Sequence, residues 1–132
     1  MKNIPDYFLA LNKQYGLALN DHQAEIHAKA VTEAWYLSID DKKQATLSVE
    51  LPDYLLPRKS LFLSRLRTEI NSNQSEVVID RLKVQLQKTD QREVEKIISG
   101  YFRSLKVVLS NEQKFSLSEL LTGRLKDLFI LA

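Results

Sequence analysis

Apolar positions along this chain recur every three to four residues, which is the period of an amphipathic α-helix. Three glycines and three prolines in 132 residues leave little material for the tight turns of a sheet. The pattern and the helix-start signals predict helices at about 5–15, 21–38, 41–51, 75–88, 90–108, 111–121 and 124–131. Pro52 predicts a further short helix after Leu51, because proline suits a first helical turn. We therefore expect an all-α fold.

The hydrophobic pattern occurs twice, with an offset of 70 residues (94 − 24 = 70). In the two long helices, Ala24, Ala28, Val31, Trp35 and Ile39 match Val94, Ile98, Tyr101, Leu105 and Leu109. Further on, Leu47, Ser48, Leu51 and Leu55 match Leu117, Ser118, Leu121 and Leu125. A constant offset over several helices indicates a duplicated helical unit.

This repeat predicts a single all-α domain over 1–132. The domain is expected to be a pseudo-two-fold helical bundle of two tandem, similar units with three to four helices each. The first unit covers about 5–56 and the second about 75–131. Pro57 opens a candidate connecting helix between them, over about 57–70.

Polar residues that cap helix starts accompany the repeated helices. Reciprocal capping boxes are predicted for Asn20 with Gln23, Asp90 with Glu93 and Ser110 with Gln113, and a single N-cap for Asp40. The first two pairs are themselves 70 residues apart (90 − 20 = 70), so the start signal repeats together with its helix.

Small residues four apart lie beside the apolar stripe of both long helices. They are Ala30 and Ala34 in the first, and Gly100 and Ser104 in the second. Because small side chains let two helix backbones approach closely, we expect the two long helices to cross at these positions.

Two apolar regions lie outside these stripes. Ile26, Ala30 and Leu37 share the opposite face of the first long helix, and burial at the centre of the fold is favoured over contact with a partner. The tail 128–132 presents the same choice between core and dimer contact.

The punctuation of the shorter helices resembles that of the bacterial DUF2267 family. Ile39-Asp40 leads to Leu47 and Leu51-Pro52, Leu109-Ser110 leads to Leu117 and Leu121, and Asp6-Tyr7-Phe8 through Gly16 resembles the family's opening segment. The second unit has Thr122 where the first has Pro52, and Gln87 where the first has Gly16. The function of that family is unknown, so the resemblance implies an all-α bacterial domain and transfers no catalytic residue.

Composition narrows the class of protein. There is no cysteine, which excludes disulfides, thiolate metal sites and cysteine nucleophiles. The formal net charge of +2 indicates no strong attraction to polyanions or to an anionic membrane. The start lacks the apolar run of a signal peptide, and no stretch is long enough to span a bilayer. We expect a cytoplasmic protein without a membrane partner.

Candidate catalytic and metal-binding residues are few. His22 and His27 are five positions apart, whereas a helical metal pair needs a spacing of four to place both rings on one side. Neither a G-x-S-x-G nor an S-x-x-K motif is present, and three scattered glycines cannot form a phosphate loop. No cofactor, metal or catalytic residue is predicted, and an enzyme is not favoured.

Arg58, Lys59, Arg65 and Arg67 form a basic segment without an intervening acid, and they are the candidate partner-binding residues. At about 100° per residue, Arg65 and Arg67 lie on either side of the apolar stripe, which is typical of a solvated amphipathic helix. We therefore favour a small non-enzymatic interaction module that acts through a protein partner or a homo-oligomer. The alternative is a nucleic-acid-binding protein that uses the basic segment 58–67, and the second alternative is an enzyme with a site between the units.

Overall fold

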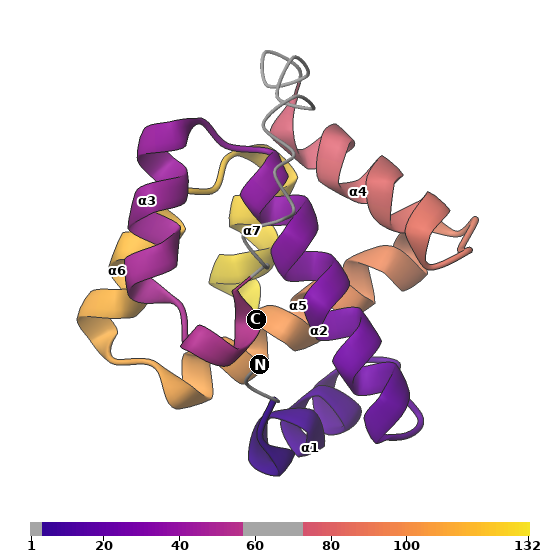
Figure 1. Ribbon diagram of the computed structural model, residues 1–132. Coiled ribbons are helices and arrows are strands. Elements are labelled where there is room, and N and C mark those ends of the chain that lie inside the picture. Colours follow the sequence, from indigo (N-terminus) through magenta and orange to yellow (C-terminus); the bar gives the residue numbers. More distant parts are fainter. Residues whose placement is uncertain (1–3, 57–72) are drawn as a thin grey trace.

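The computed structural model describes residues 4–56 and 73–132, and within them the fold is all-helical, without a strand (Figure 1). The elements are α1 (Asp6–Tyr15), α2 (Asp21–Leu37), α3 (Asp41–Glu50), the 3-10 helix η1 (Asp53–Leu55), α4 (Gln74–Gln85), α5 (Gln91–Val108), α6 (Asn111–Ser118) and α7 (Gly123–Leu131). The predicted connecting helix over 57–70 lies outside the described residues.

Two predicted helices end three residues early. The helix predicted over 75–88 ends at Gln85 because Gln87 adopts a left-handed φ of 55°, which terminates a helix. The helix predicted over 111–121 ends at Ser118, since Leu120 and Leu121 both turn into the core. The remaining boundaries agree to within one residue.

The predicted caps are confirmed in part. Ser110 and Gln113 form the reciprocal capping box, and Asp40 accepts a hydrogen bond from the Lys43 amide as a single N-cap. Asn20 caps α2, but the side chain of Gln23 accepts from the amide of Leu19 rather than of Asn20.

The box predicted for Asp90 and Glu93 is wrong. The Asp90 carboxylate accepts from the Arg92 amide, which is one residue closer than a box requires. The Glu93 carboxylate instead lies 3.4 Å from the Lys88 ammonium group, so the ion pair replaces the reciprocal cap.

The core is formed by the two apolar stripes that the sequence repeats. All ten matched positions are buried, including Ile39 and Leu109, which follow the ends of α2 and α5. Aromatic rings join the helices at the centre, with Trp35 packed edge-on against Phe102 and Phe102 against Phe129. Beside them the buried Tyr101 hydroxyl shares a hydrogen bond with the Thr32 hydroxyl, which links α5 to α2.

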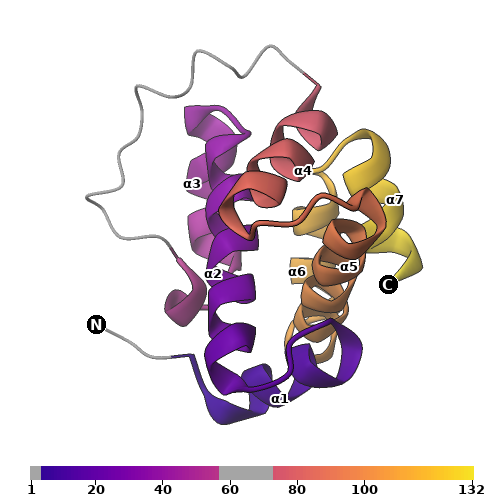
Figure 2. The same ribbon diagram turned by 90° about the vertical axis from the view of Figure 1, so that its right-hand side faces the viewer.

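The first helix of each half packs against the long helix of the other half. Helix α1 lies against α5 as well as α2, and α4 lies against α2 as well as α5. Helices α3 and α6 contact one another at the side, and α7 lies against α4, α5 and α6 (Figures 1 and 2). No helix in the described ranges has the length and apolarity needed to cross a membrane.

The close approach at Gly100 differs from the predicted one. Helices α2 and α5 do contact each other, and Ala30, Ala34, Gly100 and Ser104 are all buried. The backbone that meets Gly100, however, is the end of α1: a Cβ added there would lie 2.6 Å from the Gly16 Cα and 2.9 Å from the Tyr15 carbonyl carbon. Gly100 therefore accommodates the turn after α1, which the prediction did not include.

The two undecided apolar regions divide residue by residue. On the outer face of α2, Ala30 and Leu37 are buried, which agrees with central burial, while Ile26 is exposed. In the tail, Leu128 and Phe129 enter the core, whereas Ile130 and Leu131 face solvent.

Candidate functional site

The basic residues predicted to bind a partner, Arg58, Lys59, Arg65 and Arg67, lie outside the described residues. Of the two histidines, His22 is exposed in the first turn of α2 and His27 is half-buried one turn later. Within 4–56 and 73–132, no group of three or more acidic, histidine or cysteine side chains is placed to hold a metal ion.

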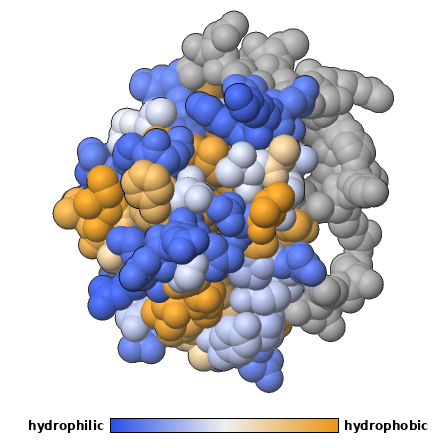
Figure 3. Space-filling model, turned by 90° about the vertical axis from the view of Figure 1, so that its left-hand side faces the viewer, coloured by the Kyte–Doolittle hydropathy of each residue, from blue (hydrophilic) through white to orange (hydrophobic). Residues whose placement is uncertain are grey.

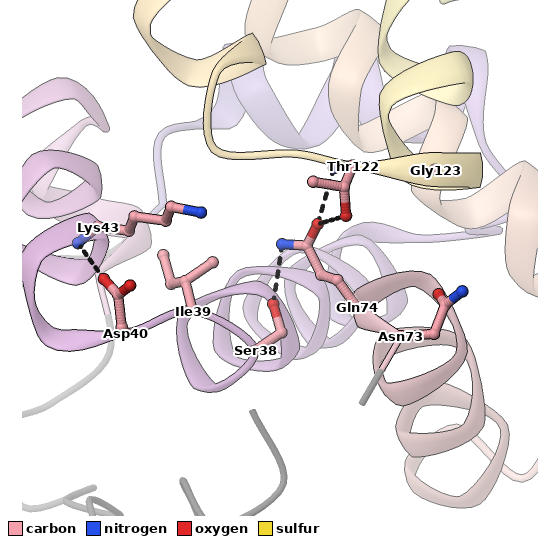
Figure 4. A pocket seen from close by; sticks show the side chains of 8 residues that line it. All are labelled: Ser38, Ile39, Asp40, Lys43, Asn73, Gln74, Thr122 and Gly123. Atoms are coloured by element: carbon pink, nitrogen blue, oxygen red, sulfur yellow. Dashed lines mark hydrogen bonds between the residues drawn. The ribbon is translucent and has the colours of Figure 1, made fainter. Parts of the chain in front are cut away.

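A polar hollow of about 390 Å³ lies where four helix ends meet: the end of α2 and the starts of α3, α4 and α7. Figure 4 shows the side chains that line it, which are Ser38, Ile39, Asp40, Lys43, Asn73, Gln74, Thr122 and Gly123.

Most polar groups of this hollow hold the helix ends. The Gln74 amide donates to the Ser38 hydroxyl (3.2 Å) and to the Leu120 carbonyl (3.1 Å), and it accepts from the Thr122 amide (2.9 Å) (Figure 4). Asp40 caps α3, and the Asn73 side chain caps α4. This hydrogen bonding stabilises a junction, and it leaves no nucleophile paired with a base.

A second depression, of about 310 Å³, has a different character. Its apolar lining consists of Leu17, Leu19, Ile26 and Leu86, and its polar rim of Gln23, His27, Gln85, Gln87 and Lys88. We call this depression the apolar groove. It lies between the α1–α2 turn, the first half of α2 and the α4–α5 turn, and both turns face the viewer in Figure 2.

Local hydrogen bonds fix the two turns that form the groove. Gly16 ends α1 with its amide bonded to the Asn12 carbonyl, and the Leu19 amide is bonded to the Gln23 side chain at 2.9 Å. On the other side, Gln87 adopts its left-handed conformation while the Lys88 amide bonds the Lys83 carbonyl at 2.9 Å. The groove is therefore formed before any partner arrives.

The apolar side chains of the groove differ in their exposure to solvent. Leu17 and Leu86 are half-buried against the core, whereas Leu19 is 84% exposed and Ile26 is 43% exposed. Protein interfaces likewise combine apolar side chains with polar ones.

Electrostatics on the rim favour a neutral imidazole. Burial, and secondarily the nearby Lys88 ammonium group, lower the pKa of His27 below its ordinary value. Lys88 in turn pairs with Glu93 at 3.4 Å. At neutral pH the wall of the groove at His27 therefore carries no charge.

The side formed by α3 and α6 has a more dispersed surface. Val49 on α3 and Phe115 on α6 are 78% and 69% exposed. Figure 3 shows hydrophobic residues on this side in patches separated by hydrophilic ones, so they provide a reference surface for the groove.

The groove was not predicted from sequence. Its lining comes from two segments that are distant in the chain, 17–27 and 85–88, and Leu17 and Leu19 follow no helical period because they lie in a turn. The sequence signal closest to it is Ile26, which was assigned to a face of α2 that is central or meets a partner.

No protein-family description, curated protein or solved structure matches this chain. The resemblance to the DUF2267 family therefore stays a prediction.

Proposed function

We propose that this protein is a small, non-enzymatic interaction module that binds a protein segment in the apolar groove. The observation that carries the proposal is the pair of exposed apolar side chains, Leu19 and Ile26, at a groove whose two turns are already fixed. The polar hollow supports it indirectly, since its hydrogen-bonding groups are engaged in joining helices.

The expected gain from covering each of these side chains is modest, so further contacts along the groove must add to it. Removing an exposed leucine or isoleucine from water contributes about 1–2 kcal/mol when burial is partial. A groove formed in advance avoids the entropic cost of ordering its walls on binding.

Peptide selection tests this function directly. A displayed library of random peptides is selected on the wild-type protein, and affinities of the selected peptides are measured by fluorescence polarisation. We expect Leu19→Ser with Ile26→Ser to weaken binding about tenfold or more, because apolar contact area is lost. Val49→Ser with Phe115→Ser is the matched control, with two exposed apolar side chains removed from the α3 and α6 side.

Two results would contradict the proposal: no peptide enriched on the wild-type protein, or binding equally weakened by both double substitutions. A second copy of this chain is also a protein partner, so molar mass by light scattering completes the test. A dimer that returns to 15.3 kDa in the Leu19→Ser, Ile26→Ser variant would place the self-contact at the groove.

We further propose that the domain consists of two similar units related by a pseudo-two-fold axis. The reciprocal packing supports this proposal, because α1 contacts α5 as α4 contacts α2, and α3 contacts its counterpart α6. An experimental structure whose two halves superpose after a rotation near 180° would agree with it. Halves related mainly by a translation would contradict it.

A further inference from the structure

The outward face of α5 carries cations at helical spacing. Arg92, Lys96 and Arg103 are all exposed, and at about 100° per residue they fall within about 40° of one another around the helix. With a rise of about 1.5 Å per residue, they extend over about 16 Å. We call these three residues the cationic stripe.

The charges of the stripe are largely available. Within the described part of the chain, Lys96 and Arg103 form no ion pair, and Arg92 reaches only its own N-cap Asp90, at 3.6 Å. The adjacent acid, Glu95, is already neutralised by Arg124 at 2.8 Å, and this hydrogen bond lowers the pKa of Glu95.

The matching face of α2 is not basic, so the stripe is not a product of the repeat. The positions 70 residues earlier are His22, Ile26 and Glu33. On α2 the charges are also paired, with Lys29 bonded to Glu25 and Glu33 to Arg81, both at 3.2 Å.

The two ends of the stripe lie close to the two turns that form the apolar groove. The Arg103 guanidinium lies 4.4 Å from the centre of the Tyr15 ring, which orders that side chain at the end of α1. The next residue, Gly16, meets α5 at Gly100, between Lys96 and Arg103, and then the chain continues to Leu17 and Leu19. At the other end, Lys88 of the groove rim lies in the α4–α5 turn, four residues before Arg92, and Figure 2 shows this turn leading into α5.

We propose that the partner of the apolar groove is an acidic protein segment, whose apolar side chains enter the groove while its carboxylates lie along the cationic stripe. This inference rests on the function proposed above and adds the chemistry of the partner. Exposed ion pairs contribute little affinity each, so the groove supplies most of the binding and the stripe selects the charge of the partner.

A protein segment fits this surface better than a nucleic acid. Helix α5 is flanked by α1 and α7 and does not protrude as a helix must to enter a major groove. Arg103 already covers one face of Tyr15, the aromatic ring beside the stripe, so a base cannot stack on that face.

Two parallel selections test the charge of the partner. One peptide library is selected on the wild-type protein and on the variant Arg92→Glu, Lys96→Glu, Arg103→Glu. We expect both pools to share an apolar motif, with an excess of Asp and Glu on the wild type and of Lys and Arg on the variant. The wild-type peptides should bind the variant about tenfold more weakly, and also several-fold more weakly in high salt.

A control and a competitor make the outcomes distinct. The variant Lys42→Glu, Lys43→Glu, Lys114→Glu changes the net charge of the protein by the same amount as the stripe variant, but on α3 and α6. It should retain wild-type affinity. If the peptides selected on the wild type and on the variant had the same charge, the partner would not be acidic, but the groove could still be the binding site. If Leu19→Ser with Ile26→Ser did not weaken binding, the groove would not be the binding site. Tighter, stripe-dependent binding of a 20-nucleotide oligo-dT would also overturn the inference, in favour of a nucleic acid.

Discussion

Gly100 lies where the backbone of α5 meets the turn that follows α1. A glycine in a helix interior costs about 1 kcal/mol relative to alanine, and here that cost is offset by a contact that no larger residue permits. The atoms nearest to an added Cβ belong to the backbone of Tyr15 and Gly16, which cannot move aside as the end of a flexible side chain does.

We expect Gly100→Ala to lower the free energy of unfolding by about 2 kcal/mol. Overpacking against backbone costs about 3 kcal/mol, and the higher helix propensity of alanine returns about 1 kcal/mol. Urea denaturation followed by circular dichroism measures the change. Ser99→Ala, one residue earlier on the same helix, should change the free energy by less than about 0.5 kcal/mol. Equal stability of the two variants would show that the approach at Gly100 is not tight.

Residue identity predicted that Gly100 serves a close approach, but not which backbone it meets. A small residue on a helix carries no information about its neighbour, and the Gly16 backbone is 84 residues earlier (100 − 16 = 84). The groove also depends on residues that are distant in the sequence. Leu19 becomes a candidate binding residue only once the α4–α5 turn is known to face it.

Helix α7 begins with a cap from another helix. Its own N-cap, Thr122, makes no capping hydrogen bond with its side chain. Instead the Ser75 hydroxyl of α4 accepts from the Leu125 amide at 3.1 Å and donates to the Thr122 carbonyl at 3.0 Å. One side chain thus satisfies two backbone groups of a distant helix start.

We expect Ser75→Ala to lower the free energy of unfolding by about 1–2 kcal/mol, as the loss of an N-cap does. Amide hydrogen exchange should speed up at the start of α7, 50 residues from the substitution (125 − 75 = 50). Ser110→Ala removes the local cap of α6 and is the comparison, with faster exchange in α6 instead. If Ser75→Ala left exchange in α7 unchanged, the cap between helices would not contribute to its stability.

Local signals determined the elements well because caps and apolar periods act within a few residues. The capping box at Ser110 and the single N-cap at Asp40 were predicted and are confirmed for this reason. The cap of α7 was missed because Ser75 and Leu125 are adjacent only in the fold.

The two halves of the molecule are joined because the first helix of each half packs against the long helix of the other. Phe8 of α1 packs against Tyr101 of α5, with 6.3 Å between the ring centres, and Arg81 of α4 pairs with Glu33 of α2. Each half therefore supplies part of the other half's core. The repeated pattern predicted the helices but not the packing of each first helix on the long helix of the other half. A helix buries the same apolar face whichever long helix covers it, so the pattern does not distinguish the two arrangements.

We expect residues 1–72 and 73–132, produced separately, to be unfolded, because each lacks one of the two long helices that cover its first helix. Mixing them in equal amounts should restore the helical circular dichroism of the intact chain. The same mixture with Phe8→Ala should recover less, since Phe8 contacts the other fragment. A fragment that melts cooperatively by itself would show that the halves are independent domains.

The packing of α1 on α5 also determines when this protein can fold during its synthesis. Phe8 emerges from the ribosome long before Tyr101, 93 residues later (101 − 8 = 93). At roughly 5–20 residues per second, the apolar face of α1 is made about 5–20 s before α5, one of the two long helices that cover it. The nascent first half is therefore the stage at which the protein is most prone to aggregate, and at which a chaperone has the most time to bind it.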